Sequence, residues 1–148
     1  MRRFFIATAT TLGVVAAVGL PAAGAAPKGQ HITRTLLGAA VSANENVYDV
    51  RGPGGYRGAA VQVAKLNSTG TAGTDRVTLF DGKGTIVSAD KFTVSKPDAN
   101  GIVTVKGTGR SLSGTGIYKH VKETYSFAGT INTKNGQYKF KLSGTIAL

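Results

Sequence analysis

Two aspartates on a predicted hairpin are the residues of this chain whose type and spacing best suit chemistry. In the stretch 74–94, TDRVTLFDGKGTIVSADKFTV, apolar and polar residues alternate on both sides of the DGKG turn. Either two-residue turn within DGKG puts Asp75 and Asp90 opposite or one step diagonal, on the face of the apolar residues. An apolar cavity disfavours the charged form of a carboxyl group, and two neighbouring carboxyls disfavour it further. The pair could therefore serve as a general acid or base near neutral pH.

Further residues share the predicted inward face of these strands. Glu123 has the parity of the aromatic residues that follow it, and Asp90 stands in the middle of its strand. The alternative is that strand-end carboxylates such as Asp75 and Glu123 face water, or that a bulge reverses the parity. The candidate catalytic residues are Asp90, Asp75 and Glu123, and the candidate lumen-lining residues are Ser88, Phe92, Tyr125 and Phe127.

Other kinds of site find little support in the sequence. His31 and His120 are the only histidines and there is no cysteine, which is too few ligands for a zinc site of usual composition. The G-x-G segments are not followed by a helix, as a dinucleotide or phosphate site would require. We therefore expect no metal and no cofactor.

The last 24 residues predict a β-hairpin whose apolar face would point to the same interior as Asp75 and Asp90. Asn135-Gly136 is a strong signal for a type I′ turn, because both of its central residues need a positive φ. A two-residue turn there places Ile131 opposite Phe140 and Tyr125 opposite Ile146, with every large apolar side chain on one face. The lysines and threonines fall on the other face, so a slip of one residue would turn the apolar set toward water.

The whole chain after its first residues has the pattern of an all-β protein. Alternating segments recur at the spacing typical of sandwiches and barrels. An antiparallel up-and-down barrel of about eight strands is preferred, because closure removes exposed edges and glycine-rich strands can bend. Only residues 36–45, LLGAAVSANE, favour a turn or two of helix. The predicted strands include 32–37, 47–51, 59–66, 74–81, 85–94, 102–105 and the closing hairpin.

One glycine-rich segment resembles a known family. GTGR at 107–110, GTGIY at 114–118 and FAGT at 127–130 are similar to the G-T-G-x-[FY] region of allene oxide cyclase and dirigent proteins. The resemblance covers about residues 73–133. It implies an eight-stranded barrel, often oligomeric, with a hydrophobic lumen open at one end. Members include plant cyclases, bacterial cyclases and secreted bacterial proteins, but their catalytic residues do not match positions here.

The N-terminus predicts export. A basic head, an apolar run over 4–20 and Ala23-Gly24-Ala25 form a signal peptide cleaved after residue 25, followed by one domain over 26–148. A twin-arginine signal is the alternative export route. The mature protein is expected to be extracellular, without a membrane span. It keeps 16 of the 18 basic residues against 7 acidic ones, which attracts anionic polymers. No basic run is long enough to predict nucleic-acid binding.

Two functions remain open at this point. The first is a secreted barrel that binds, or cyclises or isomerises, a small apolar molecule in its lumen. The second is a non-catalytic domain that binds cell-wall polymers or polysaccharide through its basic surface. An open cavity with acids at its floor would favour the first, and a lumen filled by large apolar side chains would favour the second.

Overall fold

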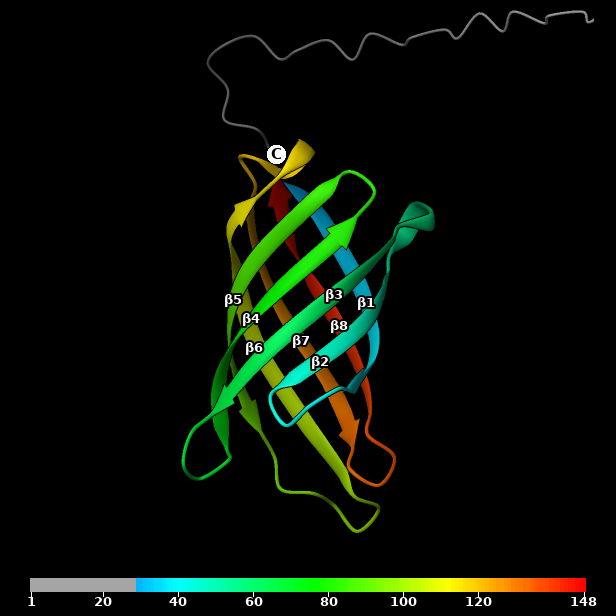
Figure 1. Cartoon of the computed structure of the whole chain (residues 1–148), viewed down its shortest axis with the longest axis vertical. Coiled ribbons are helices and arrows are strands. Elements are labelled where there is room, and N and C mark those ends of the chain that lie inside the picture. Colours follow the sequence, from blue (N-terminus) through cyan, green and yellow to red (C-terminus); the bar gives the residue numbers. More distant parts are fainter. Residues whose placement is uncertain (1–28) are drawn as a thin grey trace, which may run out of the picture.

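The computed structural model describes residues 29–148, and it forms a closed barrel of eight antiparallel strands in which each strand pairs with its neighbours in sequence (Figure 1). This confirms the predicted fold class. The predicted signal peptide lies outside the described residues. The strands are β1 (Gln30–Ala40), β2 (Glu45–Arg51), β3 (Arg57–Leu66), β4 (Ala72–Asp81), β5 (Gly84–Val94), β6 (Ile102–Gly114), β7 (Lys122–Asn132) and β8 (Gln137–Ala147). Within these residues, no helix is long and apolar enough to cross a membrane.

Closure between β1 and β8 explains why the predicted helix at 36–45 is wrong. Residues 36–40 extend β1, with Leu36 paired to Val50 on one side and to Phe140 on the other. Their backbone groups are thereby used on both edges, and Leu36 packs against the core. Only residues 41–44 remain as a loop. The tertiary pairing overrides a local helical preference.

The closing hairpin keeps the predicted face but not the predicted register. Ile131 lies opposite Tyr138, and Phe140 lies opposite Gly129, which is a shift of two residues from the expected pairing. The turn contains four residues, 133–136, and the Gly136 N–H donates to the Asn132 carbonyl at 2.8 Å. Among the described residues only glycines have a positive φ, so Asn135 cannot complete a type I′ turn. A shift of two preserves parity, and the apolar side chains still point inward.

The interior is packed at one end of the barrel and hollow at the other. Val50 and Ile86 are almost completely buried at the packed end. There the 3-10 helix η2 (Gly116–Tyr118) covers the opening, and the Tyr118 hydroxyl donates to Asp81 at 2.5 Å. A second short 3-10 helix, η1 (Pro53–Gly55), joins β2 to β3. The hollow end carries the β1–β2, β3–β4, β5–β6 and β7–β8 loops (Figure 1).

Candidate functional site

The two aspartates predicted from the hairpin face each other across the middle of β4 and β5. Asp75 pairs directly with Asp90, because the tip of the turn consists of Gly82 and Lys83. Both side chains point into the barrel and are buried, with exposed fractions of 7% and 6%. The sequence pattern therefore located a pair of carboxyl groups inside the protein.

A hydrogen-bonded chain from β2 and β3 orients Asp75. The Gln62 side-chain oxygen accepts hydrogen bonds from Asn46 Nδ2 at 2.9 Å and from the Tyr48 hydroxyl at 2.5 Å. Its amide nitrogen is thereby turned toward Asp75, where it donates to Oδ2. The other oxygen, Asp75 Oδ1, is fully buried and receives no hydrogen bond from an amide or hydroxyl donor. The Asp90 carboxyl is a further hydrogen-bond partner of Asp75, so the two carboxyls share a proton.

Tyr125 on β7 holds Asp90 from the other side. Its hydroxyl donates to Asp90 Oδ1 at 2.6 Å across the intervening strand β6. Gly109 is the β6 residue that faces both Asp90 and Tyr125, and a Cβ at this position would collide with both side chains. Gly107 makes room in the same way for the ring of Phe127. The glycines of the GTG segment thus allow side chains from β5 and β7 to meet over β6.

The carboxyl pair holds a proton at neutral pH. Burial raises the pKa of Asp90 to about 8, and the negative charge of Asp75 adds to this shift. Burial also raises the pKa of Asp75, but the hydrogen bonds from Gln62 and Asp90 oppose the increase. Asp90 is therefore the protonated member and Asp75 the ionised one. Burial and the Asp90 carboxyl raise the pKa of the Tyr125 hydroxyl as well, so Tyr125 stays a donor.

Asp90 and Tyr125 lie at the floor of a cavity in the hollow half of the barrel. The cavity has a volume of about 180 Å³. The wall is formed mainly by aromatic and aliphatic side chains, and the polar side chains Asn46 and Gln62 line one side. The aromatic rings that line it are those of Tyr48, Phe92, Tyr125, Phe127, Tyr138 and Phe140. The predicted lining residues Phe92, Tyr125 and Phe127 are therefore brought together here.

Glu123 and Ser88 point inward as expected, but they lie below this cavity in the packed half. Both line a separate void of about 30 Å³. Glu123 is 2% exposed and forms an ion pair with Arg34 of β1, and its backbone N–H donates to Ser111 Oγ at 2.9 Å. Burial raises the pKa of Glu123, whereas the Arg34 guanidinium opposes this. Glu123 therefore lies outside the cavity that Asp90 lines, although Tyr125 lines both the cavity and the void.

Three polar residues of the interior were not predicted from the sequence. Gln62 and Tyr48 orient Asp75. Arg34 neutralises Glu123, and its guanidinium carbon lies 5.4 Å from the centre of the Tyr56 ring. The parity of Arg34 with Ile32 and Leu36 could have indicated its inward position.

Neither the grouping of metal-ligating side chains nor the comparison with known proteins assigns a function to this site. Within residues 29–148, no three His, Cys, Asp or Glu side chains are grouped to hold a metal ion, and both histidines are exposed. Comparisons with protein-family models, with curated proteins and with solved structures found no match to this chain.

Proposed function

We propose that the lumen binds a small, largely apolar molecule that carries one oxygen atom, and that Asp90 donates a proton or a hydrogen bond to that oxygen. The observation that carries the proposal is a buried carboxyl, with a pKa raised to about 8, at the floor of an apolar cavity. An apolar pocket with few polar groups converging on one point is typical of a small-molecule site.

The size of the cavity limits the ligand. Pockets for drug-sized ligands usually measure about 300–1,000 Å³, so a cavity of about 180 Å³ suits a compact ring or one end of a longer molecule. A longer ligand would extend through the hollow end, past Ala43 and Leu66. The six aromatic rings favour a ring or a conjugated chain.

The protonated carboxyl suits isomerisation or cyclisation. Asp90 can give its proton to a ligand oxygen as charge develops there, and Asp75 remains ionised beside it. Once its proton is on the ligand oxygen, the Asp90 carboxylate can take a proton from the carbon next to that oxygen and deliver it to a different carbon. It then takes the oxygen's proton back, so substrate and product have the same composition. Such a reaction requires no cofactor. The resemblance of the glycine-rich segment to allene oxide cyclase and dirigent proteins agrees with this class of reaction. Because the N-terminus predicts a signal peptide, we also propose that the protein works outside the cell.

The first test measures recognition of the ligand oxygen. Cyclohexanone and methylcyclohexane have similar size, but only the ketone accepts a hydrogen bond. We expect cyclohexanone to bind more tightly, since its oxygen can share the Asp90 proton with Asp75, whereas methylcyclohexane offers no acceptor. Chemical shifts of the Tyr125 and Phe127 ring protons would report binding. Equal affinity for the two compounds would contradict the proposal.

A matched pair of variants tests the location of binding. Ala64 lines the cavity, and Ala59 lies on the outer face of the same strand, β3. Ala64→Phe should fill the cavity and abolish cyclohexanone binding, whereas Ala59→Phe should leave it unchanged. For the reaction, conversion of 3-cyclohexen-1-one to its conjugated isomer can be followed by absorbance. We expect wild-type protein to accelerate it and Asp90→Asn to lose that acceleration.

A further inference from the structure

The charges of this protein are divided between its inside and its outside. Among residues 29–148, three of the seven acidic side chains are buried in the barrel, together with one of the fifteen basic ones. The outer surface of these residues therefore carries fourteen basic and four acidic side chains. A field of this sign attracts polyanions over the whole surface, but it does not by itself define a site.

A transverse row of cations crosses the outer face of β6, β7, β8, β1 and β2. The strand register places Lys106 beside Ala128, Ala128 beside Lys141, Lys141 beside Thr35, and Thr35 beside Arg51. Neighbouring strands lie about 4.8 Å apart, so successive cations stand about 10 Å apart, with a small side chain between them. The register, and not the sequence, brings these residues into line.

A second row, of hydroxyl side chains, runs beside the first. Ser126 pairs with Ser143, and Ser143 pairs with Thr33. These three residues come from β7, β8 and β1, and they lie two positions from Ala128, Lys141 and Thr35, respectively. All three are exposed. Hydroxyl groups can donate and accept hydrogen bonds, so the two rows together present charge and hydrogen-bonding capacity.

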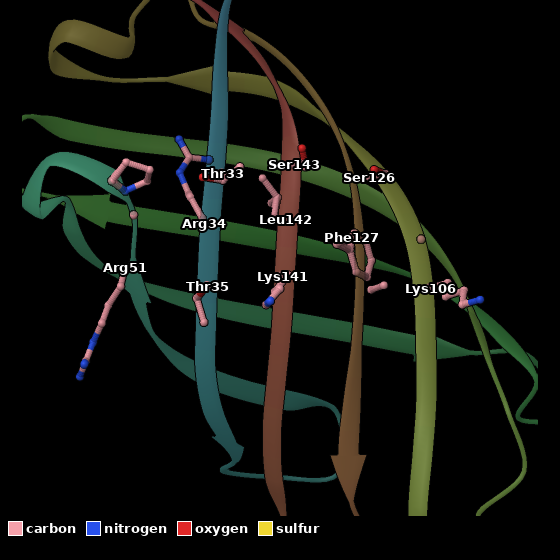
Figure 2. A pocket seen from close by; sticks show the side chains of 14 residues that line it. Thr33, Arg34, Thr35, Arg51, Lys106, Ser126, Phe127, Lys141, Leu142 and Ser143 are labelled. Atoms are coloured by element: carbon pink, nitrogen blue, oxygen red, sulfur yellow. The ribbon is translucent and has the colours of Figure 1, made fainter.

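These two rows line a hollow, or groove, on the outer surface of the barrel. Its volume is about 790 Å³, and its lining includes Gly52 and Pro53. Lys106 and Arg51 stand at opposite sides of the hollow, with Lys141 between them (Figure 2). No acidic side chain lines the hollow, although Asp49 contacts Arg51 at 2.6 Å. Lys106 and Lys141 are thus the two cations of the row without a carboxylate within ion-pair distance.

We propose that this groove binds a linear acidic polysaccharide, with its carboxylates on the cation row and its hydroxyls on the Ser126–Ser143–Thr33 row. The spacing of the cations is comparable to the length of a disaccharide. A nucleic acid would use aromatic side chains for base stacking, and an anionic membrane would use large apolar ones. The aromatic and large apolar residues of the lining, Phe127 and Leu142, also line the lumen and point away from the groove.

The test is calorimetric binding of a galacturonate oligosaccharide to the full chain, with its methyl ester as the uncharged control. We expect binding of the acid only, and weakening as ionic strength rises from about 0.05 to 0.15 M. The double variant Lys106→Gln/Lys141→Gln should lose about tenfold in affinity, because two exposed charge contacts are removed. Ala128→Glu, which puts a carboxylate between these lysines, should bind more weakly still.

The matched control removes the same charge elsewhere. Lys96 and Lys134 lie in loops at the hollow end of the barrel, outside the groove, and Lys96→Gln/Lys134→Gln should keep the wild-type affinity within about twofold. An equal loss in both double variants would show a diffuse field and overturn the groove. Absence of binding, or binding of the methyl ester equal to that of the acid, would also overturn it. Tighter, groove-dependent binding of single-stranded DNA or phosphatidylglycerol vesicles would assign a different class of partner and contradict the proposal.

Discussion

Replacing Asp90 by asparagine should stabilise this protein at neutral pH. Asparagine has the shape of a protonated aspartate, so its oxygen can still accept from Tyr125 and its amide nitrogen can donate to Asp75. The variant thus keeps both hydrogen bonds of Asp90 but cannot ionise. In the wild type, the folded protein holds a proton at Asp90 that the unfolded chain releases.

The magnitude follows from the difference in pKa between the two states. The pKa of Asp90 is about 8 in the folded protein, against an ordinary value of 3.8 for an aspartate side chain. Because the folded pKa is raised, the folded state binds more protons than the unfolded state between these two values. The contribution of Asp90 to wild-type stability therefore falls with rising pH by about 1.4 kcal/mol per pH unit in this window, and levels off above it. By pH 7 the accumulated loss is about 4 kcal/mol, which Asp90→Asn should recover.

Urea unfolding at several pH values between 4 and 8 measures this effect. The free energies of unfolding of wild type and Asp90→Asn should agree within about 1 kcal/mol at pH 4 and then diverge as the pH rises. Asp98→Asn is the control, since Asp98 is exposed in the β5–β6 loop and asparagine keeps its acceptor oxygen. The reasoning is refuted if Asp90→Asn is destabilised at pH 7, or if its difference from wild type does not change with pH.

The remaining predictions concern packing, the buried ion pair and the close approach at β6. Phe140→Ala should destabilise the protein by about 3–5 kcal/mol in urea unfolding, since Phe140 is buried against three aromatic rings. Lys139→Ala on the outer face should change stability by less than about 0.5 kcal/mol, and equal effects would contradict the inward face of β8. Arg34→Leu should cost about 3–5 kcal/mol at neutral pH by leaving Glu123 charged and buried. Arg34→Leu/Glu123→Leu should recover most of that loss, and no recovery would contradict this account. Gly109→Ala should cost about 1–3 kcal/mol and separate Tyr125 from Asp90, visible as a shift of the Tyr125 ring resonances. A variant as stable as wild type would show that the strand has room at this position.

The fold and the carboxyl pair followed from alternation, because each strand has one face inside and one outside. Asp75 and Asp90 are close in sequence and joined by a tight turn, so parity alone placed them together. The same logic predicted the face of the closing hairpin. The predicted register of β7 and β8 was wrong by two residues. The turn type depends on the dihedral angles of Asn135, which cannot be read from the Asn-Gly pair alone.

Strand β3 shows why Gln62 could not be predicted. Its valines would conventionally be turned inward, but Val63 is 54% exposed, and the inner face holds Gln62 between the small residues Ala60 and Ala64. The aromatic side chains of neighbouring strands occupy the interior of this narrow barrel, which leaves room for small residues on β3.

Contacts between distant strands escape local patterns entirely. Arg34 and Glu123 are 89 residues apart in the sequence, and they meet only because β1 closes the barrel next to β8 and β7. The cation row on the outer face arises in the same way, from five strands in register. Signal-peptide cleavage, extracellular location, the family resemblance and assembly into an oligomer stay predictions.

The most direct test of Asp90 as a proton donor in the lumen is a carbon-13 NMR titration of its carboxyl group, with and without cyclohexanone. We expect an inflection near pH 8 for the free protein, because burial and Asp75 keep the proton on Asp90. We expect a higher inflection with bound ketone, since the ligand accepts a hydrogen bond only from the protonated form. An inflection near the ordinary aspartate value of 3.8, unchanged by cyclohexanone, would contradict the claim that Asp90 is a proton donor at the floor of a ligand site.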